Sequence, residues 1–170
     1  TIRGGDATNG GSVLDQGDSI DVQGTASVVA LYGNYGADTL RIDGAATNAS
    51  IYGGKGADLM SVAGNLSADE VLGGSGSDSV IVTGTLQGGA FLYGGASAIS
   101  NDESDSFTLG GISVGTISAN DGNDTMIIAN AAKKASLYGG SGNDSVSINS
   151  NYSVGVYEGG EGADTINIGA

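Results

Sequence analysis

The stretch Gly53-Gly54-Lys55-Gly56-Ala57-Asp58 decides the fold of this chain, because close variants of it recur with the constant spacing that separates Asp38 from Asp58. Each variant is a glycine-rich turn that ends in aspartate, and the others occupy residues 33–38, 73–78, 139–144 and 159–164. The aspartates at this spacing form two runs, Asp18, Asp38, Asp58, Asp78 and then Asp124, Asp144, Asp164. A fixed period of about 20 residues is typical of proteins built from stacked repeats.

Apolar residues follow each aspartate at the second and fourth positions, as Met60 and Val62 follow Asp58. In a strand these positions point to the same side and would form core columns. Another apolar residue, Ile51 in this repeat, marks a second strand before the glycine turn. Two strands and two turns fill the period and leave no room for a helix. The sequence therefore predicts an all-β fold, a right-handed parallel β-solenoid or β-roll of about eight coils, with residues 1–170 as one domain.

A second turn is expected six positions after the aspartate, where several repeats have glycine, and glycine there indicates a positive φ. These residues are Gly24, Gly44, Gly64, Gly84 and Gly111. Two glycine-rich turns are interrupted by insertions, which lie between Gly5 and Asp18 and between Gly95 and Asp105. A solenoid tolerates insertions that are confined to one turn.

The composition restricts the ligands and partners of the chain. It has 19 acidic and 5 basic residues, a formal net charge of −14, and neither Cys nor His. Nucleic acids and anionic membranes attract clustered Lys and Arg, so this charge balance argues against both as partners. No apolar run is long enough for membrane insertion. Without thiolate and imidazole ligands, only oxygen remains for a metal, which favours hard cations.

The aspartate column predicts bound calcium. In a solenoid the aspartates would lie above one another, and such a column of like charges is costly unless cations lie between them. Ca²⁺ takes six to eight oxygens from carboxylates and backbone carbonyls. One turn offers half of such a shell and two stacked turns offer a full one, so several Ca²⁺ ions are expected between adjacent coils.

The segments Ile51 to Met60 and Leu137 to Val146 resemble the glycine- and aspartate-rich nonapeptide G-G-x-G-x-D-x-U-x of the RTX, or hemolysin-type, calcium-binding repeats. The resemblance covers nearly the whole chain. It implies a calcium-binding β-roll, type I secretion and folding outside the cell. This chain departs from the family pattern in having one motif per coil, so we expect a one-sided roll with calcium along a single edge.

The same resemblance implies the metal ligands, which are the carboxylates and the carbonyl groups of the glycine turns. The aspartates are Asp38, Asp58, Asp78, Asp124, Asp144 and Asp164, with Asp18 and Asp105 next to the insertions. The glycines are Gly33, Gly36, Gly53, Gly54, Gly56, Gly73, Gly74, Gly76, Gly122, Gly139, Gly140, Gly142, Gly159, Gly160 and Gly162. In the sixth coil, Asn120 replaces a glycine and can adopt the left-handed conformation.

Tyrosines precede several of the turns at the same repeat position, as Tyr32, Tyr52, Tyr93 and Tyr138. They could bind sugars, but stacking between coils to shield the strand ends is the favoured interpretation. The acidic loop Asn101 to Asp105 could hold a further cation or simply be a surface loop. No catalytic residues are recognised, because His and Cys are absent and the carboxylates are periodic. The chain is therefore not expected to be an enzyme.

These patterns predict a calcium-binding structural module of a secreted or cell-surface bacterial protein, of the surface-layer or adhesin type. Neither end has the cap that a solenoid needs, which indicates a segment of a larger protein. Neighbouring copies of the chain and cell-surface glycans are the possible partners. Two alternatives remain open: a glycan- or surface-binding adhesive module, and an RTX appendage of a secreted enzyme or toxin.

Overall fold

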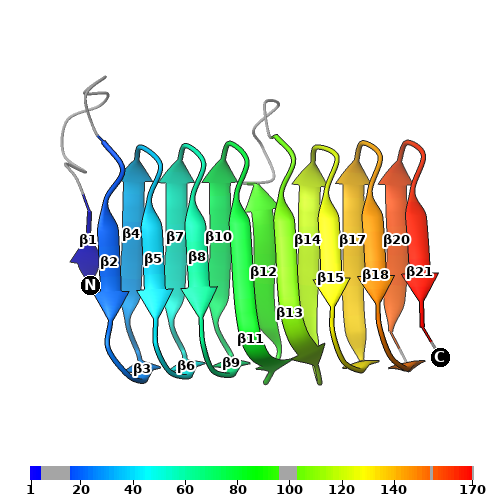
Figure 1. The fold of residues 1–170 in the computed structure, drawn as a ribbon, viewed down its shortest axis with the longest axis horizontal. Helices are drawn as coiled ribbons and strands as arrows, with labels where there is room; N and C mark the ends of the chain where they lie inside the picture. Colours follow the sequence, from blue (N-terminus) through cyan, green and yellow to red (C-terminus); the bar gives the residue numbers. More distant parts are fainter. Residues whose placement is uncertain (5–15, 96–102, 154, 170) are drawn as a thin grey trace.

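A computed structural model describes residues 1–4, 16–95, 103–153 and 155–169 (Figure 1). The regular structure in these ranges consists of parallel strands stacked in about seven turns, close to the eight coils that the sequence predicts. Strands on the near side run down, strands on the far side run up, and the chain advances from left to right in Figure 1. This sense of winding makes the solenoid right-handed, so the predicted fold class is confirmed.

Two sheets form the long walls of the solenoid. The strands that lead into the glycine turns form the entry sheet, in the order β1 (Ile2–Arg3), β4 (Ala30–Tyr35), β7 (Ser50–Lys55), β10 (Glu70–Ser75), β12 (Ala90–Gly95), β14 (Gly115–Asp121), β17 (Ala135–Ser141) and β20 (Val156–Glu161). The strands that leave the turns form the exit sheet, in the order β2 (Ser19–Val22), β5 (Thr39–Ile42), β8 (Leu59–Val62), β11 (Ser79–Gln87), β13 (Ser106–Ile112), β15 (Thr125–Ile128), β18 (Ser145–Ile148) and β21 (Thr165–Ile168).

Five two-residue strands lie at the second turn and join the ladder of the exit sheet. They are β3 (Ala26–Ser27), β6 (Ala46–Thr47), β9 (Leu66–Ser67), β16 (Ala132–Lys133) and β19 (Tyr152–Ser153). Their inward residues add a third core column, formed by Ala26, Ala46, Leu66 and Ala132 and continued by Leu86 and Ile112 of the longer strands. The sequence analysis did not find this column, because a two-residue strand leaves no periodic pattern.

The core consists of the apolar columns that the sequence predicts. Met60 and Val62 of the exit sheet and Ile51 of the entry sheet are each 2% exposed or less. Each fully buried side chain of this kind contributes about 2 kcal/mol relative to an exposed one. Ile166 and Ile168 occupy the same columns but are 40% and 46% exposed, because no described coil covers β21.

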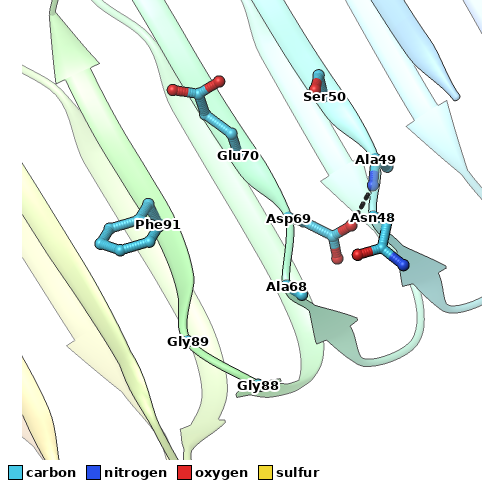
Figure 2. Close-up of a pocket in the computed structure, with 9 residues that line it drawn as sticks. All are labelled: Asn48, Ala49, Ser50, Ala68, Asp69, Glu70, Gly88, Gly89 and Phe91. Carbon is cyan, nitrogen blue, oxygen red and sulfur yellow. Dashed lines mark hydrogen bonds between the residues drawn. The ribbon is translucent and has the colours of Figure 1, made fainter. Parts of the chain in front are cut away.

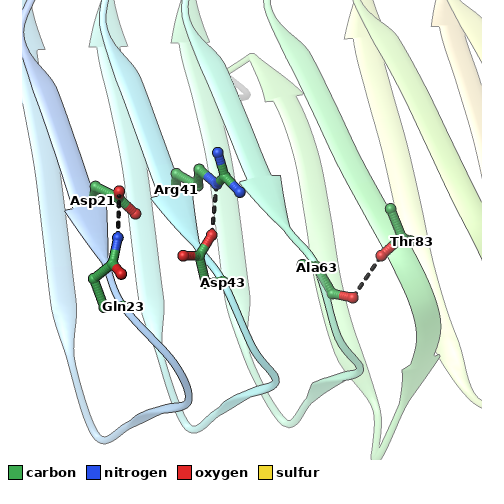
Figure 3. Close-up of polar contacts among 6 residues, drawn as sticks. All are labelled: Asp21, Gln23, Arg41, Asp43, Ala63 and Thr83. Carbon is green, nitrogen blue, oxygen red and sulfur yellow. Dashed lines mark hydrogen bonds and ion pairs between the residues drawn. The ribbon is translucent and has the colours of Figure 1, made fainter.

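The outer face of the exit sheet has short polar contacts within or between neighbouring coils (Figure 3). The Arg41 guanidinium Nε lies 2.7 Å from Asp43 Oδ1, and Thr83 Oγ1 donates a 2.6 Å hydrogen bond to the Ala63 carbonyl. Exposed ion pairs of this kind contribute little to stability. No helix long and apolar enough to cross a membrane occurs in the part of the chain that the structure describes.

The second turn differs from the expectation in its backbone conformation. Of the five glycines expected there, Gly24 has a positive φ, of 91°, and the other four do not, so the expectation was wrong for them. Close packing against the preceding coil explains why most of these four positions require glycine. A Cβ on Gly44 would lie 2.8 Å from the carbonyl carbon and oxygen of Gly24, and one on Gly84 would lie 2.5 Å from those of Gly64. Gly111 has more room, since its nearest neighbour would be 3.3 Å away.

The left-handed residue of the second turn follows the short strand, and in one coil it is Val28, with φ 50° and 80% of its surface exposed. A β-branched residue is strained in this conformation, which asparagine tolerates. Val28→Asn is therefore expected to raise the free energy of unfolding by about 1 kcal/mol. Urea denaturation in the presence of calcium measures this. Val114→Asn is the control, because Val114 is also exposed but has a negative φ, and an equal gain there would contradict the explanation.

Candidate metal centre: the aspartate column at the glycine turns

The aspartates of the glycine turns lie above one another and form a hydrogen-bonded column along one edge of the solenoid. One carboxylate oxygen, Oδ1, accepts a hydrogen bond from the main-chain N–H of the aspartate in the preceding coil. Asp38 N–H donates to Asp58 Oδ1, and Asp58 N–H to Asp78 Oδ1, both at 2.8 Å. Seven such bonds, of 2.6–3.0 Å, connect Asp18, Asp38, Asp58, Asp78, Asp105, Asp124, Asp144 and Asp164 in sequence order.

The column is buried along most of its length. The six inner aspartates, Asp38, Asp58, Asp78, Asp105, Asp124 and Asp144, are 1–3% exposed, while Asp18 and Asp164 at its two ends are partly buried. The insertion before Asp105 does not interrupt the column, since Asp105 lies between Asp78 and Asp124 in the series of hydrogen bonds. Residues 5–15 and 96–102, which include most of both insertions and Asn101 and Asp102 of the acidic loop, lie outside the described residues.

The second carboxylate oxygen, Oδ2, faces the first glycine of its own turn and a carbonyl group of the next coil. An ideal Cβ on Gly53 would lie 2.5 Å from Asp58 Oδ2 and 2.6 Å from the Gly73 carbonyl oxygen. Both oxygens therefore surround one point in front of the Gly53 Cα. For Asp58 and Asp144 this Oδ2 atom is buried and has no hydrogen-bond partner among the described residues. The same arrangement recurs at Gly33, Gly73, Gly94 and Gly139, whereas at Gly4 and Gly159, at the ends of the column, only the carboxylate of the same turn lies this close.

The other two glycines of each turn are needed for their backbone conformation and for close stacking. The second glycine has φ between 110° and 123°, as in Gly54, Gly74, Gly140 and Gly160. The last has φ between 103° and 132°, as in Gly36, Gly56, Gly76, Gly122, Gly142 and Gly162. Asn34 and Asn120 take the second position in two coils with φ 85° and 79°, so the expected left-handed asparagine is confirmed.

Burial makes the charged forms of Asp58 and Asp144 unfavourable. It raises the pKa of Asp58 from 3.8 to about 6, and the neighbouring charge of Asp38 adds to the rise, while the hydrogen bond from the Asp38 amide opposes it. Burial also raises the pKa of Asp144, with a smaller contribution from Asp164. Neighbouring coils are about 4.8 Å apart. Two like charges at this distance repel by about 3 kcal/mol at an effective dielectric constant of about 20. Protons or cations between the carboxylates would remove this repulsion.

The chemistry of the column fits a hard cation in part. Its donors are carboxylate and carbonyl oxygens, the ligands that Ca²⁺ prefers. No cluster of three or more acidic, His or Cys side chains suitable for a metal occurs within the described ranges. Any ion at the column would therefore be held by one or two carboxylates together with turn carbonyls. Asp58 and Asp144, each with a buried Oδ2 beside a carbonyl group, are the best-placed residues for this role.

The second edge of the solenoid contains a buried acid that the sequence analysis missed. Asp69 is 3% exposed, and its two oxygens accept hydrogen bonds from the main-chain amides of Ala49 and Ser67. Burial raises its pKa, against the effect of these two hydrogen bonds. The sequence does contain a signal for this residue, because an acid stands at the repeat position where the adjacent coils have Ala49 and Ala90. Asp69 connects two coils, and each of its oxygens accepts a backbone hydrogen bond, unlike Asp58 and Asp144, whose Oδ2 accepts none.

The tyrosine column is stacked where two tyrosines are neighbours. The rings of Tyr32 and Tyr52 are 4.9 Å apart with an interplanar angle of 16°, and the Arg3 guanidinium lies 5.1 Å above Tyr32. This agrees with the structural interpretation of the column. Tyr93 instead pairs with Phe91 of its own strand, at 6.2 Å. The Tyr52 hydroxyl donates a 2.6 Å hydrogen bond to Glu70 Oε2.

Comparison with known protein families, curated proteins and solved structures finds nothing that matches this chain. The class of protein that the fold defines is a parallel β-solenoid. The role of the aspartate column is therefore argued from its own residues and geometry.

Proposed function

We propose that this chain is a calcium-stabilised structural module of a secreted or cell-surface bacterial protein, of the surface-layer or adhesin type. The observation that supports it most is the buried carboxylate column, in which Oδ1 bonds the coils together and Oδ2 faces a carbonyl oxygen of the next coil. Two oxygens without a hydrogen between them attract a cation. A stiff stack of coils would act as a spacer or as a lattice element.

Calcium is the cation that suits both the ligands and the compartment. It accepts irregular shells of carboxylates and carbonyls, whereas Mg²⁺ demands near-octahedral geometry and retains its water. Where calcium is scarce, the column repels itself and the coils do not stack. Where calcium is plentiful, as outside the cell, its binding free energy becomes folding free energy.

The test is circular dichroism of the chelator-treated chain during a calcium titration. We expect a cooperative gain of β signal with calcium and no comparable gain with magnesium at the same concentration. Sodium chloride at matched ionic strength is the second control, because general screening would weaken repulsion without a specific site. A chain that is fully folded with chelator at neutral pH, or that responds equally to both divalent ions, would refute the proposal.

A further inference from the structure

Departures from the repeat gather at one place on the solenoid, on the outer face of the entry sheet beside its second turn. Glu70 and Phe91 face outward at the position where the flanking strands have Ser50 and Thr116. The buried Asp69 lies directly before Glu70. In a repeat protein the shared residues maintain the stack, so a cluster of unshared residues indicates a local role.

One additional residue opens a pocket at this place. Leu66 pairs with Leu86 at the regular spacing of the repeat, but Glu70 pairs with Phe91, one position beyond that spacing, so this turn is one residue longer. The turn contains Gly88 and Gly89, with φ 65° and 78°, and neither fills the space with a side chain. The result is an open pocket of about 340 Å³ (Figure 2). Its lining residues are Asn48, Ala49, Ser50, Ala68, Asp69, Glu70, Gly88, Gly89 and Phe91.

The polar groups of the pocket can both donate and accept hydrogen bonds. The Tyr52 hydroxyl bonds to Glu70 Oε2 at 2.6 Å, which orients the carboxylate and leaves it capacity to accept further bonds. Asn48 offers an amide and Ser50 a hydroxyl. Asp69 is buried and each of its oxygens already accepts a backbone hydrogen bond. Glu70 is thus the exposed carboxylate of the pocket and stands among neutral polar groups.

Phe91 supplies an apolar surface to the same pocket. Its side chain is 45% exposed, and its ring lies parallel to that of Tyr93, with an interplanar angle of 1°. An exposed aromatic ring that is fixed by a neighbour presents a flat surface at low entropic cost. In Figure 2 the ring stands on the strand next to Glu70, above the Gly88–Gly89 turn.

We propose that this pocket binds a neutral sugar ring of a glycan. A pyranose has hydroxyl groups at its edge, which suit Glu70, Asn48 and Ser50, and an apolar C–H face, which suits the Phe91 ring. The net charge of −14 disfavours an anionic ligand. A cationic amine would use Glu70 and Phe91 but would leave the Asn48 and Ser50 groups unused. The volume lies at the small end of known ligand pockets, enough for one or two sugar units.

The site does not depend on the calcium proposal, since none of its residues belongs to the aspartate column. Its test is a ¹⁵N–¹H NMR titration of the folded chain, in calcium, with the methyl glycosides of glucose, galactose, mannose and N-acetylglucosamine. We expect at least one glycoside to shift the amide signals of Gly88, Gly89 and Glu70 in a saturable way. Phe91→Ala should weaken this binding about tenfold, and Glu70→Gln should weaken it less.

Tyr138→Ala is the matched control, because Tyr138 is a partly buried aromatic residue of the same sheet, three strands away from Glu70 and not in the pocket lining. The Tyr138→Ala variant should bind the glycoside with the same affinity as the original chain. Phe91→Leu keeps apolar bulk without a flat ring and should also bind weakly, which separates ring stacking from a loss of folding. Absence of a saturable shift with all four glycosides would overturn the proposal. So would unchanged binding by Phe91→Ala, or a response to choline alone.

Discussion

Replacing Gly142 by alanine is expected to prevent stable stacking of the coils, with a loss of more than about 4 kcal/mol in the free energy of unfolding. Gly142 has φ 132°, which L-residues rarely adopt, and a Cβ there would overlap the carbonyl oxygen of Gly122 in the preceding coil. The obstacle is backbone, and the Gly142 amide also donates a 2.7 Å hydrogen bond to the Glu161 carbonyl. Neither coil can move away without breaking the main-chain hydrogen bonds that join the stacked coils.

Gly24→Ala is the matched control for this substitution. Gly24 also has a positive φ, of 91°, but nothing lies within 4 Å of its ideal Cβ. The free energy of unfolding of this variant should fall by only about 1 kcal/mol, which is the cost of placing alanine at a positive φ. Urea denaturation of both variants in calcium measures the difference. Similar losses for the two variants would show that backbone conformation, and not contact between stacked turns, determines the requirement for glycine.

Replacing Asp58 by asparagine is expected to have opposite effects without and with calcium. Asparagine keeps an Oδ1 acceptor for the Asp38 amide. Its Nδ2–H can also donate a hydrogen bond to the Gly73 carbonyl, whereas the ionised Asp58 Oδ2 faces that carbonyl and has no hydrogen to donate. It also removes one buried charge. In chelator at pH 8 the variant should therefore be more stable than the original chain, by about 3 kcal/mol at most, the equivalent of a pKa rise from 3.8 to about 6.

The pH dependence of the chelated chain follows from the same group. Because the folded-state pKa of Asp58 is raised above its usual 3.8, the folded state binds a proton more tightly than the unfolded state. This contribution to stability is fully present below about pH 4 and is lost as the pH rises through about 6. The chelated original chain should thus be most stable in mild acid, and Asp58→Asn should flatten that part of the profile.

With calcium at neutral pH, Asp58→Asn should be less stable than the original chain, since the substitution removes a candidate calcium ligand. The variant should need a higher calcium concentration for the same gain of β signal. The folded fraction, followed by circular dichroism across pH 4 to 8 with chelator and with calcium, measures both effects. Asp21→Asn is the control, because Asp21 is an exposed acid whose hydrogen bond is to Gln23. If Asp58→Asn behaved like this control in both conditions, the buried charge of Asp58 would not destabilise the folded chain, and Asp58 would not be a calcium ligand.

The repeat by itself determined the fold of this protein. Alternating residues such as Met60 and Val62 define a strand and its buried face, and the return of the glycine turn after a constant interval defines the length of a coil. Both are local properties of the chain, so they can be recognised without coordinates. The asparagine at position 120 is also predictable, because its left-handed conformation depends only on its own backbone.

Contacts between coils were decided only by the tertiary structure. The sequence predicts an aspartate column, but only stacking shows that Oδ1 of Asp58 holds the Asp38 amide while Oδ2 faces the Gly73 carbonyl. The same holds for Gly44, which is small because the backbone of Gly24 lies against it. The pocket beside Phe91 arises because one additional residue changes which neighbours meet across three strands. Such neighbours lie a full coil or more apart in the sequence, and their distances depend on the register of the stack, which no single repeat contains.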